Sequence, residues 1–155
     1  MRILVTGSGG FLGSQIVRDL IVRGDQVLGV SRRRYPDLVQ LGMQPVRGDL
    51  SDRDFVHRAI GDVEAVVHTA AVAGVWGPWK HFYDNNVLAT EHLIEACQAN
   101  DVPCGLTTGA GSVEERLAQG FDFVTISWGG DAGISGSAAA ALEIAREASG
   151  RGGGD

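Results

Sequence analysis

Residues 6–13 read Thr6-Gly7-Ser8-Gly9-Gly10-Phe11-Leu12-Gly13. This glycine-rich turn follows a β-branched run and opens an apolar pattern with helical spacing. At this spacing Gly7 permits a tight bend, Gly10 lets backbone amides approach a pyrophosphate, and Gly13 lets the helix pack against the sheet. The N-terminus of the helix adds a partial positive charge. We therefore predict a βαβ unit that binds a dinucleotide, with a ligand-free glycine-rich turn as the alternative.

Strand and helix patterns alternate along the rest of the chain over short connections. The predicted strands are residues 2–6, 26–30, 44–47, 65–69, 105–108 and 121–127, and the predicted helices are residues 11–22, 37–42, 51–60, 81–100, 113–119 and 138–148. Parallel neighbours need crossovers, so this alternation predicts a doubly wound, Rossmann-like α/β fold with a parallel sheet. The expected strand order is 3-2-1-4-5-6, which places the ligand crevice between the first and fourth strands.

The bulk properties predict one domain over residues 1–150 and a disordered tail at residues 151–155. The formal net charge of −6 argues against nucleic acid as a partner. The first residues lack the apolar run of a signal peptide, and no run reaches membrane-spanning length, so we expect a cytoplasmic protein without a membrane partner. Cys97 and Cys104 fit no metal or redox spacing, so we expect reduced thiols and no metal site.

The end of the second predicted strand indicates which cofactor is preferred. An NAD enzyme would place an acid there, but this chain has Ser31-Arg32-Arg33-Arg34. Guanidinium groups can clamp a 2′-phosphate through two hydrogen bonds, so Ser31 and Arg32 favour NADP(H), and NAD(H) stays open as a second cofactor. The alternative is a solvated basic turn.

A carboxylate stands at the end of the third predicted strand, in Gly48-Asp49-Leu50. Asp49 can accept a hydrogen bond from the adenine amino group, with Leu50 beside it. The alternative is that Asp49 and Ser51 together cap the helix that follows.

Together with the glycine turn and Gly48-Asp49-Leu50, two further motifs carry a family resemblance, namely Val67-His68-Thr69-Ala70-Ala71 and Phe82-Tyr83-Asp84-Asn85-Asn86-Val87 with Thr90. In combination they resemble the extended short-chain dehydrogenase/reductase family, in its NAD-dependent epimerase/dehydratase and 3β-hydroxysteroid dehydrogenase-like group. The resemblance implies that Ala70 and Ala71 border the cofactor, that Asn86 belongs to the site, and that residues 75–78 cover the nicotinamide side. For His68 we favour a strand-end residue bonded to backbone over a catalytic role. The candidate cofactor-binding residues are Gly7, Gly10, Phe11, Leu12, Gly13, Ser31, Arg32, Asp49, Leu50, Ala70, Ala71 and Asn86.

The proton-transfer pair of that family, a tyrosine with a lysine four residues later, is absent from this sequence. Its two tyrosines are Tyr35 and Tyr83, and valines stand four residues after each of them. The one lysine is Lys80. We therefore predict no catalytic residues, because Thr107 or Thr108 could supply a hydroxyl but would have no partner.

Residues 103–150 depart from the family pattern and resemble the end of an HpcH/HpaI class II aldolase TIM barrel, on the stretch from Ser112 to Ile126 that contains Gly120-Phe121-Asp122-Phe123-Val124. This predicts an engineered chimera with a junction near residues 100–105. We expect a scaffold that binds NADP(H) without turnover, as a monomer or homodimer. The alternatives are an NADP-dependent reductase or epimerase of the short-chain family, and a scaffold that binds no ligand.

Overall fold

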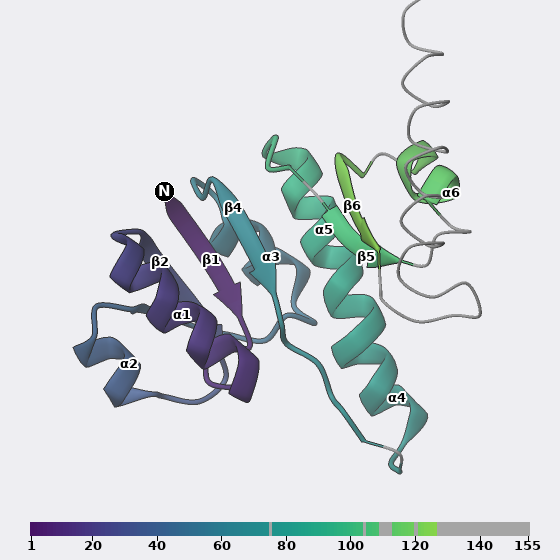
Figure 1. The fold of residues 1–155 in the computed structure, drawn as a ribbon. Helices are drawn as coiled ribbons and strands as arrows, with labels where there is room; N and C mark the ends of the chain where they lie inside the picture. Colours follow the sequence, from purple (N-terminus) through teal and green to yellow (C-terminus); the bar gives the residue numbers. More distant parts are fainter. Residues whose placement is uncertain (75, 104, 109–112, 120, 127–155) are drawn as a thin grey trace, which may run out of the picture. The chain divides into compact units, whose positions relative to one another are not determined.

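The computed structural model describes residues 1–74, 76–103, 105–108, 113–119 and 121–126 (Figure 1). The chain divides into two compact units, Met1–Val102 and Pro103–Asp155.

The first unit is built on a parallel sheet of β1 (Arg2–Thr6), β2 (Gln26–Ser31), β3 (Gln44–Arg47) and β4 (Ala65–His68). Its strand order is β3-β2-β1-β4, which confirms this part of the predicted order. The central strands β1 and β2 are buried along almost their whole length, as parallel strands covered on both faces should be. Thr6 pairs with Val30 on one side and with His68 on the other, so three strands end at the same level.

The helices of this unit are α1 (Phe11–Arg23), α2 (Pro36–Gln40), α3 (Arg53–Ile60), α4 (Trp79–Phe82) and α5 (Ala89–Ala99), with the π-helical turn η1 (Tyr83–Leu88) between the last two. In Figure 1, α1 and α2 lie on one face of the sheet and α3 on the other. The sequence predicts one uninterrupted helix over residues 81–100. In the structure, residues 83–88 of this segment form the wider π-helical turn η1. Such turns often occur at functional sites.

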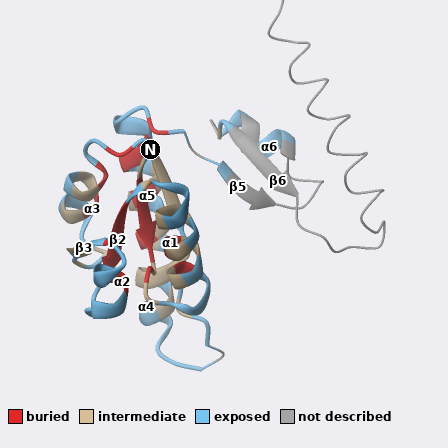
Figure 2. Ribbon diagram, turned by 60° about the vertical axis from the view of Figure 1, so that its left-hand side comes forward, coloured by how far each residue is buried: buried red, intermediate tan, exposed pale blue. Residues whose placement is uncertain are grey.

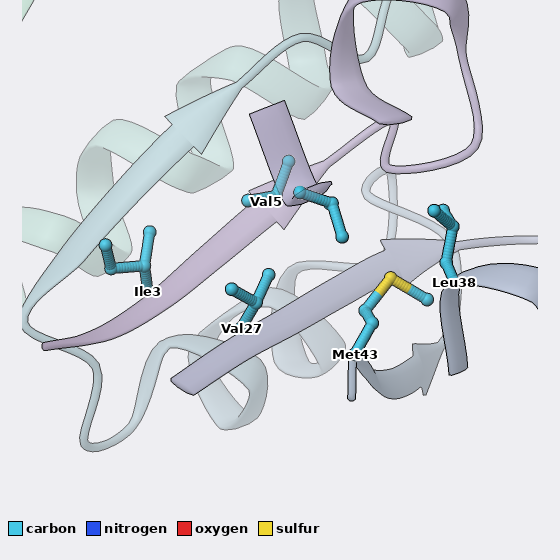
Figure 3. Close-up of a cluster of buried hydrophobic side chains, with 6 residues drawn as sticks. Ile3, Val5, Val27, Leu38 and Met43 are labelled. Carbon is cyan, nitrogen blue, oxygen red and sulfur yellow. The ribbon is translucent and has the colours of Figure 1, made fainter. Parts of the chain in front are cut away.

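The hydrophobic core beside α1 joins alternate residues of the strands to the helices. Ile3 and Val5 of β1, Val27 of β2, Val17 of α1, Leu38 of α2 and Met43 form its buried cluster (Figure 3). Each such side chain contributes about 1.5–3 kcal/mol when fully buried. The red segments in Figure 2 show that this burial is concentrated in β1 and β2. The apolar core therefore holds rigid the two strands whose ends carry the glycine turn and the arginines.

The start of α3 corrects one sequence-based prediction. Asp52, and not Ser51, is the N-cap, because its side chain accepts a hydrogen bond from the Phe55 amide at 3.0 Å. Ser51 instead donates its amide and its hydroxyl to Asp49, both at 2.9 Å. Two adjacent residues could each have capped this helix, and the sequence alone did not distinguish them.

The second unit contains β5 (Gly105–Thr108), α6 (Val113–Ala118) and β6 (Phe123–Ile126). The two strands pair in parallel, with Gly105 opposite Phe123, as a βαβ crossover requires. They form a two-stranded sheet of their own, so the predicted neighbourhood of the fourth and fifth strands stays a prediction. The predicted helix at residues 138–148 and the predicted disordered tail at residues 151–155 lie outside the described residues. Among the residues that are described, no helix has both the length and the apolar character needed to span a membrane.

An ion pair joins α3 to α5. The Nε of Arg53 donates to a carboxylate oxygen of Glu95 at 2.8 Å, and a second guanidinium nitrogen contacts the other oxygen. These bonds lower the pKa of Glu95 from its ordinary 4.5 to about 2. A carboxyl with a depressed pKa stabilises the fold above its unfolded-state value, and that stabilisation is lost as the pH falls through the folded-state value.

We therefore expect Glu95→Gln to lower the free energy of unfolding at pH 7. The difference from the unchanged protein should shrink from pH 4.5 downwards and become small as the pH falls through about 2, because Glu95 then takes up a proton and becomes neutral like the glutamine. Urea denaturation at a series of pH values measures it, and Glu91→Gln on the same helix is the matched control. A penalty that is equal at pH 7 and pH 2 would contradict this account.

Candidate functional site

A cavity of about 340 Å³ opens at the carboxyl ends of β1, β2 and β4. It is lined by Gly7, Gly9, Gly10, Val30, Ser31, Arg32, Arg33, Tyr35, Gly48, Asp49, Leu50, Thr69, Ala70, Ala71, Val72, Asn85 and Ala89. Eight of the predicted site residues are in this set, namely Gly7, Gly10, Ser31, Arg32, Asp49, Leu50, Ala70 and Ala71. The structure thus brings together segments as far apart in the sequence as Gly7 and Ala89.

The glycine turn forms one end of the cavity. Gly7 has a φ of +64°, and a Cβ there would lie 2.8 Å from the Ala70 nitrogen, so this bend and this contact both favour glycine. A Cβ on Gly13 would lie 2.2 Å from the Gly7 carbonyl oxygen, so α1 can approach the turn only with glycine at this position. Gly10 precedes α1 in extended conformation and offers no capping side chain. The amides of the first turn, those of Phe11 and Leu12 included, are therefore available to an anion.

Three predicted residues of this region do not line the cavity. Gly13 lies behind the turn, where it provides the close packing just described. Phe11 and Leu12 are 99% and 59% exposed, and their side chains do not line the cavity. Their backbone amides at the start of α1 are the groups that could bind an anion.

The other end of the cavity carries opposite charges. Arg32 and Arg33 line it and Arg34 does not, so two of the three arginines lie where a phosphate could be bound. A guanidinium nitrogen of Arg32 lies 3.9 Å from Asp49 Oδ2. The Ser51 amide, the Ser51 hydroxyl and then the Arg32 charge lower the pKa of Asp49, so this carboxyl is ionised at neutral pH. Asp49 is thus a hydrogen-bond acceptor inside the cavity, and its prediction as a helix cap is wrong because Asp52 caps α3.

Residues 69–72 form the wall beside β4. The amides of Thr69 and Ala70 donate to the Thr6 hydroxyl, at 3.2 and 3.3 Å. The hydroxyl of Thr69 donates to the Thr6 carbonyl at 2.7 Å. Thr6 is fully buried, so these bonds tie the wall to the end of the central strand.

Asn86 does not line the cavity, although the resemblance placed it in the site. Its side-chain oxygen accepts from the Val72 amide at 2.8 Å, and its side-chain nitrogen donates to the Val72 carbonyl at 3.1 Å. Its neighbour Asn85 lines the cavity instead. Asn86 therefore fixes the backbone of the wall, and Asn85, whose side-chain nitrogen donates to the His81 carbonyl, lines the space.

His68 lies at the end of β4, as expected, but its ring contacts two side-chain hydroxyls where bonds to backbone were expected. Its Nδ1 lies 2.6 Å from the Thr6 hydroxyl and its Nε2 lies 3.1 Å from the Thr90 hydroxyl. The residue as a whole is exposed, but both ring nitrogens are turned toward these hydroxyls. Their desolvation lowers the pKa of His68 below its ordinary value of 6.5.

The sequence missed nine cavity residues: Gly9, Val30, Arg33, Tyr35, Gly48, Thr69, Val72, Asn85 and Ala89. Seven of them adjoin predicted residues in the chain, and these neighbours could have indicated them, whereas Ala89 adjoins none. Tyr35 carried no such signal. Its ring folds back over Gly9, where a Cβ would lie 1.8 Å from a ring carbon, and this contact joins the arginine turn to the glycine turn.

The described residues around the cavity provide polar binding groups, but they include no tyrosine–lysine pair for proton transfer. Lys80 makes an ion pair with Asp84 at 2.5 Å, and the ring of Tyr83 stacks at a tilt on Trp79. Trp76 and Trp79 are 90% and 76% exposed and do not line the cavity. Cys97 is buried, and Cys104 lies outside the described residues. Within the described ranges, no group of His, Cys, Asp or Glu converges as a metal site would require.

Comparison with known proteins agrees with this geometry. Residues 3–119 match the NAD dependent epimerase/dehydratase family. A 2-alkyl-3-oxoalkanoate reductase of Stenotrophomonas maltophilia (strain K279a) is 43% identical over 116 residues, which are 75% of this chain and 35% of that protein. A 2-alkyl-3-oxoalkanoate reductase of Shewanella oneidensis is 42% identical over 95 residues, which are 61% of this chain and 24% of that protein. The chain thus spans about a third or less of the length of these relatives.

Solved structures show the same fold. MoeE5 in complex with UDP-glucose and NAD superposes with a TM-score of 0.61 at 33% identity, over 70% of this chain and 36% of that one. The enzyme WbmH of Bordetella bronchiseptica in complex with NAD⁺ superposes with a TM-score of 0.57 at 27% identity, over 69% of this chain and 39% of that one.

The family match continues past the predicted junction at residues 100–105, as far as residue 119. None of the relatives and structures just described is an aldolase, so the predicted aldolase part and the engineered chimera find no support in them. The glycine turn, the parallel strand order and the wall that follows β4 all lie inside the matched range. The chain belongs to the NAD dependent epimerase/dehydratase family.

Proposed function

We propose that this chain binds NADP(H) as the nucleotide-binding part of a reductase of this family. The observation that carries the proposal is the pair of arginines, Arg32 and Arg33, lining the same cavity as the glycine turn. A dinucleotide phosphate needs an amide-rich site for its pyrophosphate and cations for its 2′-phosphate. This cavity offers both.

The residues present fit this cofactor. A Cβ on Gly7 or Gly13 would fill the space in which turn and helix meet, so the turn is shaped by backbone alone. The first-turn amides of α1 would hold the pyrophosphate, and Arg32 with Arg33 would hold the 2′-phosphate. Asp49 would accept from the adenine amino group, while Ala70 and Ala71 would border the chain of the cofactor. When bound, NADPH supplies a hydride, and the residues of this chain bind and orient it.

The named relatives suggest the substrate class. Two of them are 2-alkyl-3-oxoalkanoate reductases, so we propose a ketone of the 3-oxo acid type as the substrate of the complete reaction. These 155 residues hold no tyrosine after Tyr83 and no Tyr–Lys pair four residues apart. We therefore propose that residues 1–155 bind the cofactor without turning it over. This absence also supports the second candidate, a cofactor-binding scaffold without a reaction of its own.

Equilibrium titration with NADPH, NADH and adenosine 2′,5′-bisphosphate tests the proposal. Because two charge-assisted hydrogen bonds distinguish the phosphate from a hydroxyl, we expect NADPH to bind at least about 10-fold more tightly than NADH. Adenosine 2′,5′-bisphosphate should compete with NADPH. Equal affinities for NADPH and NADH would contradict the choice of cofactor, and no binding of any of the three would contradict the proposed function.

A further inference from the structure

Hydrogen bonds around His68 form a closed ring that includes the wall of the cofactor cavity. Starting from His68, the ring passes through Thr6 to the amides of Thr69 and Ala70. It returns from Val72 through Asn86 and Thr90 to the other nitrogen of His68. The wall is therefore held at one end by Thr6 and at the other by Asn86, and His68 connects the two.

The donors and acceptors of this ring fix the form of the imidazole. The Thr90 hydroxyl donates its one proton to the Asn86 carbonyl at 2.8 Å, so toward His68 it can only accept. His68 Nε2 must therefore carry a proton. The Thr6 oxygen accepts from two backbone amides, so its own proton is donated to His68 Nδ1. Nδ1 is then an acceptor, and the imidazole is neutral with its proton on Nε2.

We propose that His68 is a positioning residue for the cofactor, and that its neutral Nε2-protonated form holds residues 69–72 in the binding geometry. His68 does not line the cavity; it acts through Thr6 and Thr90. The affinity test of this inference rests on the proposed function, whereas the test of the protonation state of the imidazole does not.

Protonation of His68 would break the ring. A second proton on Nδ1 would face the Thr6 oxygen, whose lone pairs already accept two amide hydrogens. The groups that face the imidazole are the Thr6 hydroxyl from β1 and the Thr90 hydroxyl from α5, and neither is charged. Among the described residues, no charged side chain shifts the pKa of His68; desolvation alone lowers it. The positioned wall is therefore complete above the ordinary histidine value of 6.5 and is lost as the pH falls through the lower value of the folded protein.

Nitrogen-15 NMR of the histidine rings in the unmodified protein tests the assignment without any ligand. We expect His68 to show a protonated Nε2 and an unprotonated Nδ1 at pH 7.5, with a pKa below 6.5. A proton on Nδ1, or a charged ring at pH 7.5, would overturn the proposal.

Affinity for ADP-ribose tests the positioning role, because this probe lacks a 2′-phosphate that would itself titrate. We expect His68→Phe to weaken binding at pH 7.5 by about 10-fold, as the loss of two hydrogen bonds suggests. His68→Phe combined with Thr90→Val should be no weaker than His68→Phe alone, because both changes break the same ring. His57→Gln, on α3, is the control and should leave the affinity within about 2-fold.

Rescue by an uncharged amide separates positioning from simple packing. His68→Gln keeps a donor and an acceptor but cannot gain a proton, so we expect most of the affinity to return and to stay constant from pH 7.5 to pH 5. The unmodified protein should lose affinity over the same range. A His68→Phe variant that binds normally, or a His68→Gln variant that keeps the pH dependence, would overturn the role of His68. If the unmodified protein bound no nucleotide while showing the expected imidazole, the proposed function would fail and the ring would stand.

Discussion

Gly13→Ala is expected to lower the affinity for NADPH by about 100-fold, which corresponds to about 2.7 kcal/mol. The added Cβ would lie 2.2 Å from the Gly7 carbonyl oxygen and 2.8 Å from the Thr69 hydroxyl oxygen. Both neighbours are held by the end of β1, so α1 itself must move away from the turn. That movement displaces the amides that would hold the pyrophosphate. The same overpacking should lower the free energy of unfolding by about 1–3 kcal/mol.

Fluorescence titration and urea denaturation of the Gly13→Ala variant measure the two effects. Gln15→Ala is the matched control, because Gln15 lies on the same helix, is exposed, and bonds only to Asp19 among the contacts seen for it. It should change the unfolding free energy by no more than about 0.5 kcal/mol. Normal NADPH affinity in a folded Gly13→Ala protein would mean that the pyrophosphate does not bind at this turn.

Replacing Arg32 and Arg33 together by alanine is expected to weaken NADPH binding by about 100-fold and to leave NADH binding almost unchanged. Each charge-assisted hydrogen bond to a phosphate contributes about 1.5–3 kcal/mol, and NADH has no 2′-phosphate to lose. Loss of Arg32 also removes the cation that lies 3.9 Å from Asp49, so the bare carboxylate would repel a phosphate further. The selectivity between the two cofactors should therefore disappear.

Arg34→Ala is the control for this pair, because Arg34 belongs to the same turn but does not line the cavity. It should preserve the preference for NADPH. Equal losses of NADPH and NADH affinity in the double variant would show that the arginines support the fold of the turn and not recognition of the phosphate.

The fold of the first unit could be predicted from its sequence because its signals are local. Apolar periodicity located β1 to β4, and the glycine spacing placed the turn before α1. The order β3-β2-β1-β4 followed from the doubly wound fold that the alternation of strands and helices predicts. The π-turn could not be predicted, because Tyr83–Leu88 has the same apolar spacing as an ordinary helix.

The site was predictable where a residue's role comes from its own backbone or charge, as for Gly7 and Arg32. It was not predictable where the role comes from a partner distant in the chain. Tyr35 packs over Gly9, and His68 bonds to hydroxyls twenty-two and sixty-two residues away. The aldolase-like interpretation of residues 103–150 depends on a short stretch of local likeness at residues 112–126. The family match runs through residue 119 and so includes the first part of that stretch.

We propose that one cavity holds both the pyrophosphate, at the glycine turn, and the 2′-phosphate, at the arginine turn. Amide NMR shifts recorded while NADPH is added to the labelled protein test it most directly. We predict shifts at Gly10, Phe11 and Leu12 and also at Ser31 to Arg33, while NADH should shift the first group and leave the second nearly still. Shifts confined to other parts of the chain, or no shifts with millimolar NADPH, would contradict the claim.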